Sequence, residues 1–197
     1  MTRNRIDEML AANGRFQAQI NVDNLPKRAP EPLAVITCMD PRLNLEAIGI
    51  PPFSPDGTGH SDIRIIRTIG GMVEARSLIV GAFLAGIREF ALLMHTDCGC
   101  CLAYAKIDTI IDNMETRLTF AQLQRFKQQI GEPFRANLMT YLKVFEDPRQ
   151  AIQRELKDIR AQSYVPDDIV LHGLLYDTGT GEVQVVSNGY ESYTPRS

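Results

Sequence analysis

The stretch Leu33-Ala34-Val35-Ile36-Thr37-Cys38-Met39-Asp40-Pro41-Arg42 joins a short apolar run to a thiol, a carboxylate and a guanidinium. In a second stretch, Phe90-Ala91-Leu92-Leu93-Met94-His95-Thr96-Asp97-Cys98, an apolar run is likewise followed by an imidazole, a carboxylate and a thiol. Apolar runs of this length, rich in branched side chains, are typical of buried strands in a parallel sheet. In open α/β sheets, ligands bind beyond the carboxyl ends of the strands. The sequence therefore predicts that the polar groups of both stretches meet at one edge of a sheet.

Cys38, His95 and Cys98 form a candidate zinc ligand set. Two thiolates and one imidazole leave a fourth position open, which is the pattern of catalytic rather than structural zinc sites. This soft donor set also favours zinc over magnesium or calcium. A single cysteine is most often a small buried hydrophobe, so the prediction depends on the two motifs occurring together.

Asp40 and Arg42 are the candidate catalytic pair, because they follow the predicted ligand Cys38 on the same loop. A bidentate bond from an arginine lowers the pKa of a carboxylate and fixes its direction. Asp40 held in this way would be an obligate hydrogen-bond acceptor beside the metal. Released from Arg42, it could instead bind the metal and close the site. The alternative is a loop salt bridge with no catalytic role.

The rest of the chain predicts an α/β fold with a mostly parallel central sheet flanked by helices. We expect a single domain over residues 1–197, with residues 1–20 as an N-terminal arm. Strands are predicted at residues 33–37, 63–66, 90–94 and 169–175, with residues 182–186 returning as a hairpin after the turn at 177–181. Helices are predicted at residues 2–18, 73–87 and 148–162, the last capped by Asp147, and over most of 102–146 with a break at 131–133. Residues 21–32 are expected to be a polar link and residues 49–60 a surface loop.

Composition excludes several classes of protein. Apolar residues make up 44% and charged residues 23% of the chain, as in ordinary globular domains. The net charge of −3 gives no electrostatic case for binding nucleic acid or an anionic membrane. No apolar run approaches the roughly 20 residues of a membrane span, and the first residues do not resemble a secretory signal. We therefore expect a cytoplasmic protein with reduced thiols.

Other cysteines and histidines have simpler explanations. Cys98 and Cys101 have the spacing of a zinc ribbon, but such a site needs a second pair that the sequence lacks. We therefore expect Cys100 and Cys101 to pack in the core at the start of a helix. His60 is expected in an exposed loop and His172 in the core with its hydrogen bonds satisfied.

The two motifs resemble the Cys-x-Asp-x-Arg and His-x-x-Cys motifs of the β-class carbonic anhydrases. The match is good from residue 33 to 99 and looser for the N-terminal helix and for residues 171–177. The resemblance implies that Cys38, His95 and Cys98 bind zinc and that Asp40 and Arg42 act as a pair beside the metal-bound water. It implies hydration of carbon dioxide to bicarbonate by zinc-bound hydroxide. It also implies a homodimer or homotetramer in which the N-terminal helix packs on a partner subunit.

The short chain and C-terminal hairpin look most like the compact branch of this family, which includes carbonyl sulfide and carbon disulfide hydrolases. Carbonyl sulfide hydrolysis is therefore the alternative activity. A zinc-holding regulatory protein, with Asp40 closing the site permanently, is a third hypothesis, and the intact Arg42 argues against it. The chain departs from the family pattern at Pro41, where the family usually has a small residue, and at Thr68-Ile69, where the family often has Asn-Ala.

Ile69, Gly70 and Gly71 are the candidate substrate-binding residues. The bulky side chain of Ile69 is expected to narrow or reshape the substrate channel. The backbone N–H groups of Gly70 and Gly71 could donate to an anion such as bicarbonate. A tight turn between a strand and a helix would explain the two glycines equally well.

Overall fold

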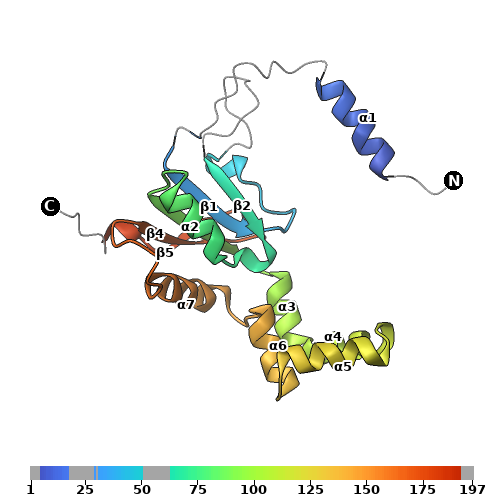
Figure 1. Cartoon of the computed structure of the whole chain (residues 1–197). Helices are drawn as coiled ribbons and strands as arrows, with labels where there is room; N and C mark the ends of the chain where they lie inside the picture. Colours follow the sequence, from blue (N-terminus) through green and yellow to red (C-terminus); the bar gives the residue numbers. More distant parts are fainter. Residues whose placement is uncertain (1–4, 18–28, 30, 51–62, 192–197) are drawn as a thin grey trace.

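A five-stranded sheet forms the centre of the part of the chain that the computed structural model describes, residues 5–17, 29, 31–50 and 63–191. The strands are β1 (Leu33–Cys38), β2 (Arg64–Thr68), β3 (Glu89–His95), β4 (Val170–Tyr176) and β5 (Val183–Ser187). Their order is β2-β1-β3-β4-β5, with β5 antiparallel to β4 and every other pair parallel (Figure 1). The predicted mostly parallel α/β sheet is confirmed. Each predicted strand is present, shifted or extended by one or two residues.

Two helices, α2 (Ala75–Phe83) and α7 (Pro148–Arg160), cover the same face of the sheet. A Cβ on Gly81 of α2 would lie 3.0 Å from the ring of Phe90, and a Cβ on Gly173 would lie 2.5 Å from Ile152 of α7. Phe90 and Leu92 point to the same face of β3, and Leu92 is paired with Gly173. The absence of a Cβ at Gly81 and Gly173 therefore lets both helices approach the sheet closely.

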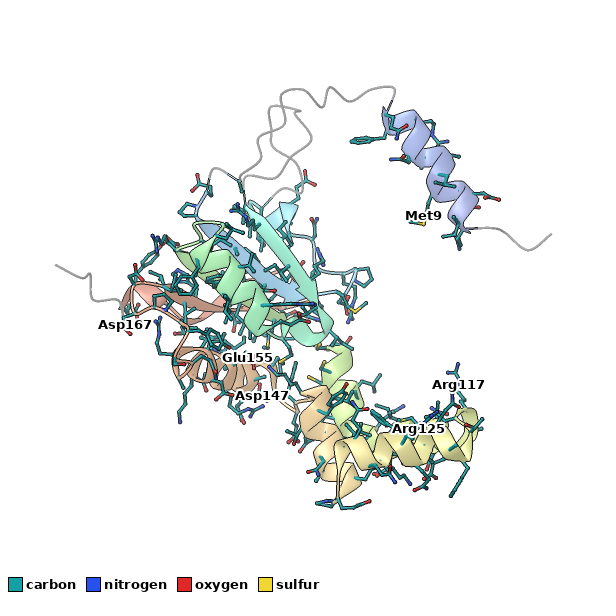
Figure 2. The ribbon with its side chains drawn as sticks, in the orientation of Figure 1. Met9, Arg117, Arg125, Asp147, Glu155 and Asp167 are labelled. Atoms are coloured by element: carbon teal, nitrogen blue, oxygen red, sulfur yellow. The ribbon has the colours of Figure 1, made fainter. Side chains whose placement is uncertain are left out.

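The helix α7 begins as the sequence predicts. The Asp147 carboxylate accepts a hydrogen bond of 2.8 Å from the backbone N–H of Arg149, and Pro148 is the first helical residue (Figure 2). Buried Glu155 then ties this helix to the segment before α2, because its Oε1 accepts bonds from the Val73 N–H and the Lys143 ammonium, both at 3.0 Å.

A group of short helices continues the chain after β3 and extends away from the sheet (Figure 1). These are α3 (Gly99–Ala105), α4 (Ile107–Arg117), α5 (Phe120–Ile130) and α6 (Phe134–Leu142). They have a small core of their own around Ile107, Phe134 and Leu138. The predicted break at residues 131–133 is confirmed, since α5 ends just before it and α6 begins just after it.

The N-terminal helix α1 (Arg5–Gln17) buries none of its residues. Its apolar side chains are exposed: Ile6, Met9, Leu10 and Phe16 (Figure 2 labels Met9). A helix within residues 2–18 is thus confirmed, whereas its packing on a partner subunit remains a prediction.

One helix differs from the sequence-based prediction, and two predicted segments lie mostly outside the described residues. The helix expected at residues 73–87 is shorter, because α2 ends at Phe83 and the chain turns at Gly86 with a φ of +73°. Most of the predicted link at 21–32 and of the loop at 49–60, including His60, lies outside the described residues. Among the described helices, none is long and apolar enough to cross a membrane.

Candidate metal centre

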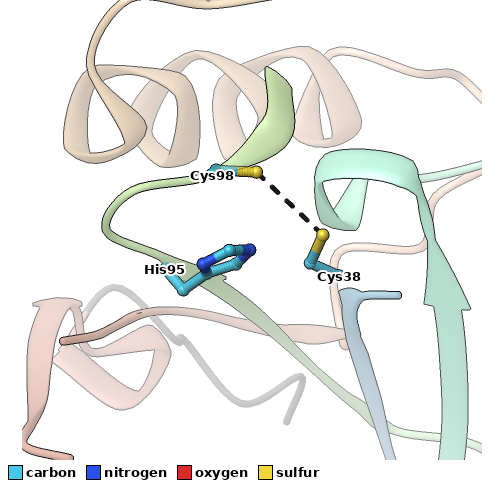
Figure 3. Close-up of side chains that lie close together, drawn as sticks. All are labelled: Cys38, His95 and Cys98. Carbon is cyan, nitrogen blue, oxygen red and sulfur yellow. Dashed lines mark hydrogen bonds between the residues drawn. The ribbon is translucent and has the colours of Figure 1, made fainter. Parts of the chain in front are cut away.

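Cys38, His95 and Cys98 meet at the carboxyl edge of the sheet (Figure 3). Cys38 ends β1, His95 ends the neighbouring β3, and Cys98 caps the N-terminus of α3. Each residue has one candidate ligand atom that lies within 4.8 Å of those of the other two residues. The Sγ atoms of Cys38 and Cys98 are 4.0 Å apart. All three residues are buried, so the structure brings together the three residues that the sequence predicted as ligands.

The imidazole of His95 is oriented with a free lone pair in this cluster. Its Nδ1 lies 2.8 Å from the carbonyl oxygen of Thr96, which can only accept, so Nδ1 carries the proton. In the neutral imidazole, Nε2 is then the unprotonated nitrogen. It is the buried side-chain N or O atom that lacks a hydrogen-bond partner in the described part of the chain. A bound metal ion would satisfy this otherwise costly atom.

The two thiols also fit a cation. The pKa of Cys38 is raised to about 12, first by its contact with Cys98 and then by burial. The pKa of Cys98 is raised as well, chiefly by a side-chain hydrogen bond with Cys100. Without a positive charge, two adjacent buried sulfurs stay protonated, whereas a metal ion deprotonates coordinating thiols. The residues therefore fit zinc, which accepts this set of soft ligands.

Asp40 lies beside this cluster and is held by Arg42. The guanidinium donates two parallel bonds, from Nε to Asp40 Oδ1 at 3.0 Å and from Nη2 to Asp40 Oδ2 at 2.8 Å. The Arg42 backbone N–H donates a third bond to Oδ1 at 2.9 Å. These bonds hold the pKa of Asp40 well below its usual range. Asp40 Oδ2 is 3.9 Å from His95 Nε2, so an ionised carboxylate borders the three candidate ligands.

Two residues to which the sequence analysis assigned no role also hold this edge together. Arg42 Nη1 donates to the Asp97 carboxylate at 2.6 Å, and Nη2 donates to the Asp97 carbonyl at 2.8 Å. Arg67 donates to the carbonyl oxygens of Cys38, Asp40 and Leu43. Asp97 lay inside a quoted motif, but nothing local in the sequence indicated its partner 55 residues away.

Ile69, Gly70 and Gly71 form a tight 3-10 turn, η2, between β2 and α2. Gly70 and Gly71 have φ values of +67° and +72°, and a Cβ on Gly71 would lie 3.4 Å from the backbone nitrogen of Cys38. The two glycines therefore allow the positive φ values of this turn, and Gly71 allows the turn to pack closely against the end of β1. Ile69 and Met39 are each 63% exposed, so two apolar side chains flank the loop ends near the cluster.

Cys100 lies in the core as expected, whereas Cys101 and His172 are only partly buried. Cys100 is buried at the start of α3, Cys101 is partly buried, and neither belongs to the three-residue cluster. His172 is partly buried in β4, and its Nδ1 accepts a hydrogen bond of 3.1 Å from the Gly189 N–H.

The chain is similar to several known proteins along most of its length. No family model matches the chain. It is 28% identical over 185 residues to β-carbonic anhydrase 1 of Mycobacterium tuberculosis, covering 92% of this chain and 97% of that protein. A crystal structure of carbonic anhydrase from Streptococcus mutans has a TM-score of 0.66 at 26% identity and covers 95% of this chain and all of that one. The apo form of a carbon disulfide hydrolase has a TM-score of 0.57 at 22% identity and covers 91% of this chain and 88% of that one.

The sheet, the three-residue cluster and these similarities together describe a protein with the fold of the β-carbonic anhydrases. The resemblance inferred from the two motifs is confirmed, and it extends over nearly the whole chain. The relatives are carbonic anhydrases, which indicates that this chain is an enzyme, and its three-residue cluster could bind a metal ion.

Proposed function

We propose that this protein is a zinc-dependent enzyme that hydrates carbon dioxide to bicarbonate and a proton. The observation that carries the proposal is the buried Cys38, His95 and Cys98 cluster. Among the described residues, its His95 Nε2 has no hydrogen-bond partner, and it lies 3.9 Å from a carboxylate held by an arginine. These three residues would hold the metal. Zinc, when bound, supplies the Lewis acidity that makes hydroxide available from water near neutral pH.

Asp40 is the proposed acceptor beside the attacking water. Arg42 keeps this carboxylate ionised and directs both of its oxygens, so it can accept hydrogen bonds but cannot donate them. A hydrogen bond from the water to Asp40 Oδ2 would hold one proton away from the substrate. The oxygen lone pair would then point at the electrophilic carbon. Pre-set geometry of this kind lowers the barrier without motion of the protein.

The proposed approach to the site suits a small apolar substrate. Met39 and Ile69 are exposed near the cluster and offer no hydrogen bonds, which matches a linear molecule such as carbon dioxide. Ile69, Gly70 and Gly71 are proposed to line this approach, with the glycine N–H groups as donors to the bicarbonate product. We also propose a cytoplasmic protein with one domain over residues 1–197 that assembles as a homodimer or homotetramer.

Carbonyl sulfide hydrolysis is the second candidate activity, because the same attack on a linear, apolar molecule would release hydrogen sulfide. The exposed apolar pair Met39 and Ile69 would accept either substrate. A difference of one atom in an apolar pocket is expected to contribute only about 1–3 kcal/mol of discrimination.

A side-by-side assay of the zinc-loaded protein tests the proposal. We expect hydration of carbon dioxide well above the buffer rate and measurable consumption of carbonyl sulfide. Ile69→Ala should change the ratio of the two activities while the zinc content stays constant. Rapid loss of carbonyl sulfide with no hydration above buffer would replace the proposed activity by the second candidate. Absence of turnover on both would favour a zinc-holding regulatory protein.

A further inference from the structure

Arg42 is bound from two sides by two different acidic residues. Asp40 occupies the Nε and Nη2 edge of the guanidinium, whereas the Asp97 carboxylate binds Nη1 and the Asp97 carbonyl oxygen shares Nη2. Four side-chain bonds therefore fix the guanidinium plane. The bonds also join the loop after β1 to the loop after β3, and each of these loops follows a strand that ends in a proposed zinc ligand.

The backbone at Asp97 is shaped for this contact. Its φ of +52° lies in the left-handed region, which side chains other than glycine adopt at a cost and which aspartate and asparagine tolerate best. This conformation occurs between His95 and Cys98, in the turn where the chain passes from β3 to α3. Backbone conformations of this kind persist where the surrounding contacts determine them, and here those contacts are the two bonds to Arg42.

We propose that Asp97 is a positioning residue, which holds Arg42 against Asp40 and so keeps the Asp40 carboxylate beside the metal rather than on it. This inference rests on the proposed function, because it assigns a second acid to the same site.

The distances explain why a second anchor is needed. Asp40 Oδ2 is only 3.9 Å from His95 Nε2, the proposed ligand atom, so a carboxylate released from Arg42 could reach a metal ion held there. The bond that prevents this approach comes from Arg42, whose side chain is 45% exposed. An exposed ion pair holds its geometry weakly when it acts alone. The Asp97 carboxylate is itself 80% exposed, but together with the Asp97 carbonyl oxygen it binds the same guanidinium at Nη1 and Nη2, so that Arg42 is restrained by two sets of bonds rather than one.

Two variants distinguish the effect of the Asp97 carboxylate from the effect of the Asp97 backbone. Asp97→Gly keeps the left-handed turn and the carbonyl contact but removes the carboxylate. Asp97→Asn keeps the size and the turn preference but removes the charge. The matched control is Asp108→Asn, because Asp108 is an exposed acid in a bidentate pair with Arg135, at 2.7 and 3.0 Å, on the helices α4 and α6.

The protein loaded with cobalt(II) in place of zinc reports the metal ligands by visible absorption, independently of turnover. We expect Asp97→Gly to shift the cobalt spectrum in the same direction as Arg42→Ala, toward a site with a bound carboxylate, and Asp97→Asn to shift it less. Adding Asp40→Asn to Asp97→Gly should reverse the shift, because an amide is a poorer ligand. Asp108→Asn should match the wild-type spectrum.

Carbon dioxide hydration is measured on the same proteins loaded with zinc. We expect kcat to fall at least tenfold in Asp97→Gly at an unchanged zinc content. A wild-type cobalt spectrum in both Asp97 variants, or in Asp97→Asn if Asp97→Gly does not fold, would overturn the positioning role. Failure of the wild type to hydrate carbon dioxide would instead refute the proposed function, while the cobalt comparison would still decide the role of Asp97.

Discussion

The sulfur atoms of Cys38 and Cys98, which are 60 residues apart in the chain, lie 4.0 Å from each other at the buried edge of the sheet. This spacing and the unpaired His95 Nε2 lead to the first prediction, that the protein binds one zinc ion per chain. Removing it with a chelator should lower the thermal unfolding temperature. A ligand present at about 100 times its Kd contributes about 2.7 kcal/mol to folding, so we expect at least this loss of unfolding free energy.

Substitution of the ligands tests which residues hold the zinc. Cys38→Ser and His95→Ala should each lose most of the zinc found by elemental analysis. Cys101→Ser is the matched control, because Cys101 is not part of the cluster, and it should keep the metal. Full zinc retention in both ligand variants would show that the metal binds elsewhere.

Arg42→Ala tests the proposed catalytic pair. The variant removes the two guanidinium bonds to Asp40 and leaves only the bond from the backbone N–H, so the carboxylate loses its fixed direction. We expect carbon dioxide hydration to fall about 100-fold, the cost of misplacing a catalytic group by roughly 1 Å. The loss should be largest below neutral pH, where hydroxide competes less well with the freed carboxylate. Zinc content should not change, and unaltered turnover would remove the pair from the mechanism.

Gly70→Ala should destabilise the protein for two reasons that can be separated. A Cβ at Gly70 would lie 2.6 Å from the Cys100 sulfur, and φ is +67°. Gly86→Ala is the matched control, since φ there is +73° and no atom lies within 4 Å of the new Cβ. The control should lose about 1–2 kcal/mol of unfolding free energy from backbone strain alone.

Overpacking should cost Gly70→Ala about 1–3 kcal/mol beyond that strain, as measured by denaturant unfolding. The double variant Gly70→Ala/Cys100→Ala should recover part of this difference. Equal losses for the two single variants would mean that the contact with Cys100 relaxes without cost.

Tyr190 gives a pH-dependent prediction at the other end of the sheet. Its hydroxyl donates a hydrogen bond of 2.6 Å to Glu89, which raises the pKa of the phenol above its ordinary value. Because the folded-state pKa is the higher one, the bond stabilises the fold fully below about pH 10 and is lost as the pH rises through the folded-state pKa. Absorbance titration of the wild type minus Tyr190→Phe should show ionisation above pH 10. In Glu89→Gln the pKa should return toward 10, whereas a wild-type Tyr190 that ionises at or below 10 would contradict the prediction.

Deletion of residues 1–20 tests the role of α1 in assembly. The apolar side chains of this helix are exposed in the single chain, so a second copy of the chain would give them a surface to pack on. We expect the shortened protein to sediment as a monomer or to aggregate, with a parallel fall in activity. A full-length protein that is monomeric at micromolar concentration would contradict this role.

The elements that could be predicted are those whose sequence pattern lies within the element itself. Strands such as β1 and β3 could be predicted because a buried strand carries its signal in its own consecutive side chains. The start of α7 was equally predictable, since Asp147 and Pro148 cap it locally. The early end of α2 could not be predicted, because the apolar residues after Phe83 suit either a longer helix or a turn that packs against it. The structure has the turn, in which Ile87 lies against Gly81.

The sequence by itself determined the candidate ligands and the candidate catalytic pair, because each motif follows directly on a strand and parallel strands deliver their ends to one edge. Only the tertiary structure decided which partners those residues have. The bonds from Arg42 to Asp97, the contact of Gly70 with Cys100 and the unpaired nitrogen of His95 each depend on segments far apart in the chain. Their geometry is set by the register of β1, β2 and β3 and by the turns that follow them, and no local pattern of residues encodes it.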